Sequence, residues 1–276
     1  MSKSNHCISC GSNLQGEYCA RCGERKLEPE LRKFSNLVGD LVESVTSLDG
    51  KLFKSLANLI FKPGINEYNF HRGSRVKFMR PIALFLFVNV IFVTLMPLSD
   101  FFVSFGSQHR QLYSPYILNW IENFVLASGL SPLEFETQYN QLVKILARSI
   151  IIISVPFLLP FVILVFRDKE YFVSDHFVFS LNVYAWLMLW MLVSWWFCVF
   201  TAFIFEVLFS FEFSPFVLYS PLMLLGVLVY LLMAIKRMYR QSWLMSLLKM
   251  PVILLGVAVS HMMFRLIQLG LTMWAV

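Results

Sequence analysis

Long apolar runs fill most of the chain from about residue 81 onward, and they limit the possible folds more than any other feature. A helix needs about 20 mostly apolar residues to cross the hydrocarbon core of a bilayer, which is about 30 Å thick. Charged residues make up only 14% of the chain, whereas about 25% is usual in a soluble domain. We therefore expect an all-α integral membrane helical bundle over residues 81–276. Its five expected transmembrane helices cover about residues 79–98, 145–166, 177–205, 214–235 and 251–273.

The distribution of Lys and Arg predicts how these spans are oriented. Basic residues are frequent before the first span, between the second and third, and between the fourth and fifth. The other connections are poor in them, since residues 99–142 contain only Arg110 and residues 206–213 contain none. Cytoplasmic loops carry the excess of Lys and Arg in membrane proteins. The N-terminus is therefore expected in the cytoplasm, and the C-terminus and the 99–142 loop, with one or two short helices, on the outer side.

The start of the chain is polar and carries four cysteines in two copies of one pattern. Cys7, Cys10, Cys19 and Cys22 each belong to a Cys-x-x-Cys-Gly turn within residues 1–26, which we call the cysteine knuckle. Four thiolates in a tetrahedron suit Zn²⁺, with bonds of about 2.3 Å. The spacing predicts a small zinc ribbon with a structural Zn²⁺, because four Cys ligands leave no open coordination position. Iron in the same cage, a pair of disulfides, or a redox-active dithiol are the alternatives.

Residues 27–80 predict a linker followed by cytoplasmic or interfacial amphipathic helices. Apolar residues recur at helical spacing over 34–48 and again over 51–61, and the second stretch ends at Lys62-Pro63-Gly64. These helices either lie on the membrane surface or against the spanning bundle, or form a hairpin packed on the cytoplasmic loops of the protein. No apolar signal-peptide core precedes them, so the first span is expected to act as its own insertion signal.

A basic run lies immediately before the first span. It contains Arg72, Arg75, Lys77 and Arg80. Juxtamembrane basic residues can contact anionic lipid headgroups, although setting the orientation also explains them. The net charge of +6 is attributed to such loops, and no nucleic acid partner is expected.

Polar residues interrupt the fifth predicted span. His261, Arg265 and Gln268 fall on one face of a helix. They can line a polar groove, because ionisable groups within spans are costly and often functional. Alternatively, Arg265 lies at the outer interface and extends its charge into water. Pro156 and Pro160 are expected to bend the second span.

The order of features in the first third of the chain resembles a family of bacterial membrane proteins known only as a domain of unknown function. The resemblance is carried by the knuckle with Leu14-Gln15-Gly16-Glu17-Tyr18-Cys19 between its halves, Leu48-Asp49-Gly50-Lys51, Lys62-Pro63-Gly64, Tyr68, Gly73, Arg75, Phe78 and Pro81. Members open with a zinc ribbon and continue into several spans. The resemblance implies a multi-pass protein of the bacterial inner membrane, and it supplies no catalytic residues.

These features favour a non-enzymatic membrane scaffold or sensor. Its zinc ribbon would contact a protein partner or another copy of the chain. A transporter or lipid-handling protein, built on the bent second span and the polar face of the last one, is the competing hypothesis. An enzyme is disfavoured because the sequence shows no nucleophile motif, no paired carboxylates in the spans and no nucleotide motif.

Overall fold

The computed structural model describes residues 6–14, 16–24, 50–95, 103–111, 113–149, 151–168, 170–210 and 214–276. The regular elements of these residues are helices, in agreement with the all-α prediction, and one isolated bridge joins His6 and Asn13. The helices are α2 Lys51–Phe61, α3 Ile65–Arg72, α4 Pro81–Leu95, η2 Phe105–Arg110, α5 Ser114–Ser128, α6 Pro132–Ser149, η3 Ile151–Ile153, α7 Ser154–Val165, α8 Val173–Phe209, α9 Phe216–Met238 and α10 Trp243–Ala275. The amphipathic stretch predicted over 34–48 lies outside the described residues.

Three of the described helices, α8, α9 and α10, are long and apolar enough to cross a membrane by length and composition. They correspond to the third, fourth and fifth predicted spans. With 37 residues, α8 is about 55 Å long at 1.5 Å per residue. It therefore exceeds the hydrocarbon thickness of about 30 Å and must tilt or extend beyond it.

The prediction of five spans is not confirmed in the described part of the chain. The described part of the first predicted span is α4, which has 15 residues up to Leu95, fewer than the roughly 20 that a crossing needs. The second is not one straight helix, because α6 and the η3–α7 segment meet at a bend of 63°. This bend lies before Pro156, and α7 continues through Pro160. A fourth span results if this bent pair crosses as one.

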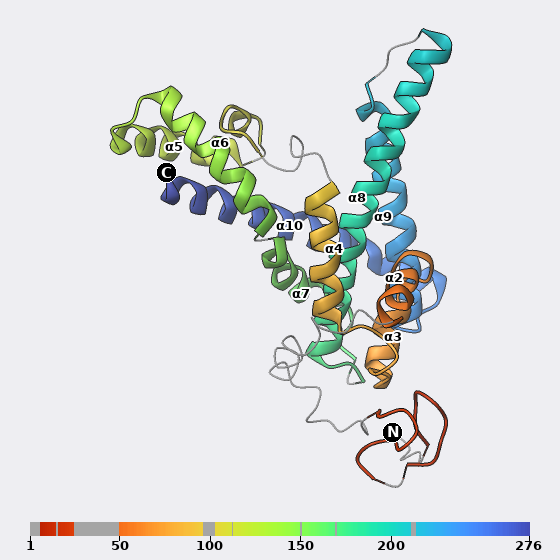
Figure 1. Cartoon of the computed structure of the whole chain (residues 1–276). Helices are drawn as coiled ribbons and strands as arrows, with labels where there is room; N and C mark the ends of the chain where they lie inside the picture. The colour runs from red at the N-terminus through yellow and green to blue at the C-terminus, as the bar shows by residue number, and fades with distance from the viewer. Residues whose placement is uncertain are drawn as a thin grey trace.

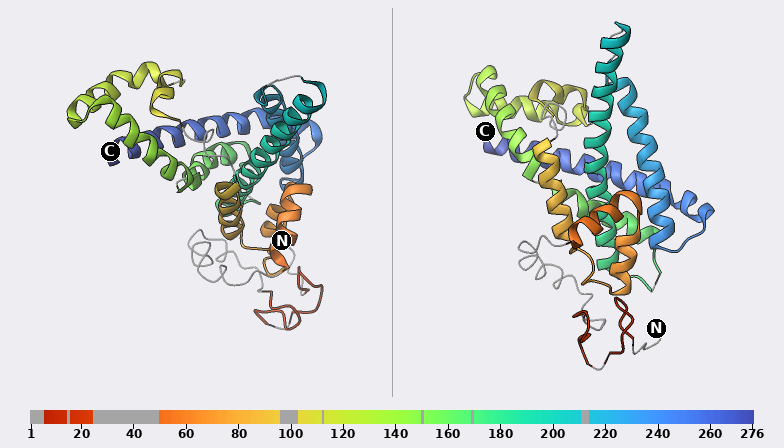
Figure 2. Two further views of the ribbon diagram at one scale, coloured as in Figure 1. Left: turned by 45° about the horizontal axis from the view of Figure 1, so that its top comes forward. Right: turned by 45° about the vertical axis from the view of Figure 1, so that its right-hand side comes forward.

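α8 is the central element, against which α3, α4, α7 and α9 pack. α4, α8 and α9 run side by side, and α10 crosses them at a wide angle in both sets of views (Figures 1 and 2). The contact between α8 and α9 is close, since a Cβ at Gly226 would lie 2.2 Å from the Trp190 indole. Small residues allow such close approach between membrane helices.

The segment predicted as an exterior loop forms a separate helical layer. η2, α5 and α6 pack together on the C-terminal half of α10, away from the cysteine knuckle (Figure 1). A small apolar core holds this layer in place, and it consists of Tyr113, Ile121, Phe135, Tyr139, Val143, Leu269 and Met273. The layer contains two α-helices, α5 and α6, and the second continues into the bend before α7.

α2 and α3 form a hairpin packed on the protein itself. α2 buries Leu52, Ser55 and Leu59 against neighbouring helices and contacts α3, α4 and α8. α3 lies between the N-terminal part of α8 and the C-terminal part of α9. Residues 51–61 thus pack against the long helices α4 and α8, whereas their predicted partner over 34–48 lies outside the described residues.

Candidate functional site

The four predicted thiol ligands come together at one point of the cysteine knuckle. Their Sγ atoms all lie within 4.8 Å of one another. Cys7 and Cys22 are 3.5 Å apart, as are Cys10 and Cys19, and none of these cysteines forms a disulfide. A tetrahedral site with Zn–S bonds of about 2.3 Å has sulfur–sulfur edges of about 3.8 Å. The donor set therefore fits a closed four-thiolate site that can hold one metal ion.

Two matching turns build this thiol cluster. In each turn a glycine N–H donates to the carbonyl of the first cysteine, from Gly11 to Cys7 and from Gly23 to Cys19, both at 2.8 Å. The φ angles of Gly11 and Gly23 are +75° and +72°, a conformation that residues with a Cβ rarely adopt. This requirement explains why glycine follows the second cysteine of each pair.

The hydroxyl of Ser12 lies between the two halves of the cluster, and the sequence pattern did not single it out. It is 2.9 Å from Cys10 Sγ and 3.0 Å from Cys19 Sγ. The pKa of Cys19 is lowered to about 6, and the hydrogen bond between Ser12 and Cys19 is the largest cause. Ser12 therefore favours the thiolate form, which is the form that binds metals.

Glu24 joins the knuckle to the segment that precedes α4. Its buried carboxylate accepts hydrogen bonds from the backbone N–H of Arg75, at 3.0 and 3.1 Å, and of Val76, at 3.1 Å. It also accepts a hydrogen bond from the hydroxyl of Ser9, which in turn lies 2.8 Å from the hydroxyl of Ser74. We call these contacts the Glu24 dock. Sequence reasoning missed it, because a carboxylate that binds backbone N–H groups 51 residues away leaves no local pattern.

The predicted lipid-contact residues divide into two kinds. Arg72 and Lys77 are exposed, whereas Arg75 and Arg80 are half-buried. The Arg75 guanidinium lies 4.7 Å from the centre of the Phe70 ring. The exposed pair is therefore more accessible to a membrane surface, although the Arg72 guanidinium also lies 5.6 Å from the centre of the Tyr68 ring.

The polar residues of the last predicted span lie together on α10. Arg265 Nε is 3.4 Å from His261 Nε2, and Arg265 Nη1 is 3.2 Å from Gln268 Oε1. Gln268 is buried, and its Nε2 is 3.4 Å from the carbonyl oxygen of Val143 in α6. The stripe thus faces the helical layer formed by η2, α5 and α6.

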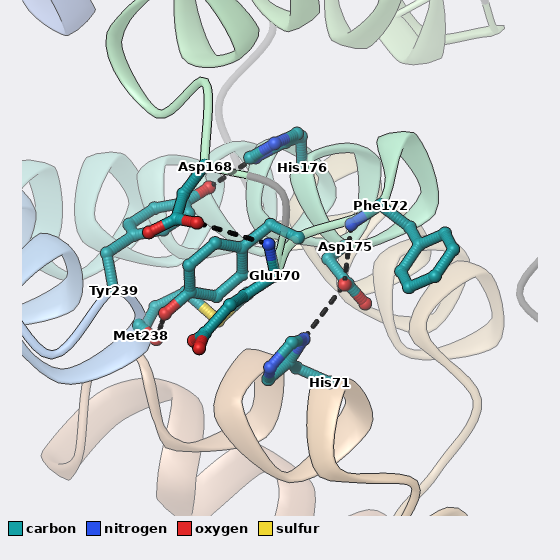
Figure 3. Close-up of polar contacts among 9 residues, drawn as sticks. His71, Asp168, Glu170, Phe172, Asp175, His176, Met238 and Tyr239 are labelled. Atoms are coloured by element: carbon teal, nitrogen blue, oxygen red, sulfur yellow. Dashed lines mark hydrogen bonds and ion pairs between the residues drawn. The ribbon is translucent and has the colours of Figure 1, made fainter. Parts of the chain in front are cut away.

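A second polar cluster, which the sequence analysis did not identify, lies where α3 meets α8. His71 Nδ1 of α3 is 2.9 Å from Asp175 Oδ2, and the same oxygen accepts the Phe172 N–H at 3.0 Å (Figure 3). Next to it, His176 Nδ1 is 2.9 Å from the hydroxyl of Tyr239, just after α9. These contacts tie α3 to the start of α8, and the start of α8 to the end of α9.

The comparison with protein families finds one match. A family model described as "Protein of unknown function (DUF3667)" matches residues 49–93. It covers α2, α3 and most of α4, which is where the resemblance described above is densest. No curated protein and no solved structure matches the chain. The match thus agrees with a family of unknown function. It includes the segment between α3 and α4 to which the cysteine knuckle is attached.

Proposed function

We propose that this chain is a non-enzymatic scaffold or sensor of the bacterial inner membrane, in which a zinc-filled knuckle governs the position of α3. The knuckle faces the cytoplasm, and the C-terminus lies in the periplasm. The observation that carries the proposal is the Glu24 dock, which fastens the metal site to residues 74–76. A site with four thiolate ligands is structural, so zinc here holds a shape and performs no chemistry.

The contacts form a continuous path from the metal site to the long helices. Residues 74–76 directly follow α3, and Ser74 N–H donates to the carbonyl of Asn69 in α3 at 2.9 Å. α3 in turn packs against α8 and α9. A knuckle of this size has almost no apolar core, so it is expected to fold only around its metal. Loss of zinc or oxidation of the thiols would therefore remove the Glu24 dock and release the segment that follows α3.

The knuckle also carries two exposed apolar side chains. Ile8 and Tyr18 are 44% and 58% exposed, whereas Ser9 and Glu24 are buried in the dock. Exposed apolar side chains on a small metal module support contact with a protein partner or a second copy of the chain.

Hydrogen exchange of the full-length protein in nanodiscs tests the proposal. Purified protein should contain one zinc per chain, and the amides of Arg75 and Val76 should be protected from exchange. A zinc chelator should remove the metal and most of this protection. Absence of both zinc and iron, or unchanged exchange at these amides after chelation, would contradict the proposal.

A second candidate, a transporter or lipid-handling protein, is favoured by the continuous contacts of His261, Arg265 and Gln268 on α10. Such a protein would lose activity on His261→Ala or Arg265→Ala while its level in the membrane stayed normal. A fall in protein level without a specific loss of transport would instead assign these residues to folding.

A further inference from the structure

α3 is held between α8 and α9 by contacts on both sides. On the α9 side, Arg237 Nη1 donates to the carbonyl of Pro63 at 2.6 Å. Gly64 lies so close to α9 that an added Cβ would be 2.6 Å from the carbonyl oxygen of Ala234. On the α8 side, His71 meets Asp175. Any group that changes its charge within this contact changes the free energy of holding α3 there.

Glu67 is such a group. It is 1% exposed, and its Oε1 has no hydrogen-bond partner in the described structure. Burial raises the pKa of Glu67 to about 7, against weaker opposing effects of a hydrogen bond with Asn182 and the charge of Arg237. A carboxylate in this position is poorly solvated, so the neutral acid is the form that fits the packed state.

His71 lies one helical turn after Glu67 and faces the same side of α3. Its ring is 2.9 Å from Asp175 Oδ2, while Asp175 Oδ1 is buried without a hydrogen-bond partner. The ring of Tyr171 lies beside the His71 ring, with the two ring centroids 4.7 Å apart. The His71–Asp175 contact fastens the end of α3 to the start of α8.

We propose that Glu67 is a proton-binding site, and that the bound proton holds α3 between α8 and α9. The ligand is the proton itself, taken from the side of the molecule on which the cysteine knuckle lies. This proposal is independent of zinc, because Glu67 is not part of the Glu24 dock.

The direction of the pH effect follows from the raised pKa of Glu67. Below about pH 4.5, the ordinary pKa of a carboxyl group, Glu67 is neutral whether α3 is held or released, so its burial costs little. Between about pH 4.5 and 7 Glu67 is ionised in the released state but still protonated in the packed state, so the packed state progressively loses stability, and this loss levels off above about pH 7. Acid therefore favours the held position of α3, and alkali favours its release.

Other titratable and charged groups also line this junction. α3 contributes His71, α8 contributes Asp175 and His176, α9 contributes Tyr230 and Arg237, and the flanking segments contribute Tyr171 and Tyr239. Burial raises the pKa of Tyr171 and Tyr239 further above their ordinary range, so they stay neutral near pH 7. The positive charge of Arg237 favours ionised Glu67, an effect already included in the pKa of Glu67.

Hydrogen exchange of full-length, zinc-loaded protein in nanodiscs of phosphatidylethanolamine and phosphatidylglycerol tests the proposal. The readout is exchange over residues 64–73, corrected for the intrinsic effect of pH. Shifting a carboxyl pKa from its ordinary 4.5 to about 7 changes the opening equilibrium by roughly thirtyfold between about pH 8.5 and pH 5.5. Protection should therefore rise by that factor on acidification.

Two variants separate the site from general effects of pH. Glu67→Gln mimics the neutral acid, so it should remain protected at both pH values and lose most of the pH dependence. Glu170→Gln removes an exposed carboxylate near the same end of α8 and should retain the full dependence.

Infrared difference spectra of the unmodified chain provide a direct check that does not depend on a variant folding. A buried protonated carboxyl band should appear below pH 7 and disappear above it, and this band should be missing in Glu67→Gln. The proposal is overturned if no such band titrates near neutral pH, or if Glu67→Gln keeps the pH dependence of the unmodified chain.

Discussion

The Glu24 carboxylate accepts the backbone N–H of Arg75 at 3.0 Å, across 51 residues of sequence. One side chain of the cysteine knuckle thereby supports the segment that leads into α4. A carboxylate that receives several N–H and O–H donors makes strong, charge-assisted hydrogen bonds. The knuckle is thus fastened to the rest of the protein by a group that is not itself one of the four predicted ligands.

Replacing Glu24 should weaken this attachment and leave the metal site intact. Glu24→Ala removes bonds to a charged group, which are worth about 1.5–3 kcal/mol, and it leaves the N–H groups of Arg75 and Val76 without an acceptor. We expect faster exchange at these two amides with an unchanged zinc content. Glu17→Ala, at an exposed position of the same knuckle, should change neither quantity. Loss of zinc in Glu24→Ala would show instead that this residue supports the metal site.

Removing one ligand should abolish stable metal binding. Cys10→Ser leaves three thiolates and an open position, so zinc should be lost to a competing chelator that the unmodified protein resists. Elemental analysis of purified protein measures this difference. Cys198→Ser provides the control, because Cys198 is buried in α8 away from the knuckle. If Cys10→Ser retained full zinc content, the four-thiolate assignment would be wrong.

Gly64 tests how closely α3 packs on α9. Its φ of +83° costs any L-residue about 1–2 kcal/mol. An added Cβ would also clash with the Ala234 carbonyl, and overpacking adds about 1–3 kcal/mol. Gly64→Ala should therefore lower thermal stability more than Gly129→Ala, where φ is +72° but no atom lies within 4 Å of the added Cβ. Equal losses of thermal stability in the two variants would mean that α3 can move away from α9 without a cost in free energy.

The exposed basic pair Arg72 and Lys77 should contribute to the retention of anionic lipid. Each such charge near anionic headgroups is worth about 1 kcal/mol, so Arg72→Gln with Lys77→Gln should weaken binding of phosphatidylglycerol by roughly thirtyfold. Lipid titration in mixed micelles at low salt measures this effect. The matched control is Arg110→Gln with Lys144→Gln, which removes two exposed charges from the η2–α6 layer. Equal binding by both double variants would exclude a lipid role for Arg72 and Lys77.

Features that depend on nearby residues could be predicted from the sequence. The gathering of Cys7, Cys10, Cys19 and Cys22 follows from two tight turns with a short connection. The apolar runs that become α8, α9 and α10 have the length and composition of helices that can cross a membrane. Pro156 and Pro160 predicted a bend in the second span, and a bend is found before them, where α6 turns aside as part of a separate layer.

Other features could not be predicted, because they depend on how distant helices pack. The sequence of residues 79–98 predicts a span, but it does not show that α4, the described part of it, packs along α8. The His71–Asp175 contact joins residues 104 positions apart, and no periodicity links them. The burial of Glu67 likewise depends on two other helices closing over α3.

The sequence by itself determined the membrane-compatible composition, the helical elements and the set of thiol ligands, since each follows from residues close together in the chain. Only the tertiary structure decided where the knuckle is attached, which carboxyl groups are buried and how α10 crosses its neighbours. The physical reason is that burial and hydrogen-bond pairing arise when separate helices exclude water between them, and this depends on their mutual arrangement.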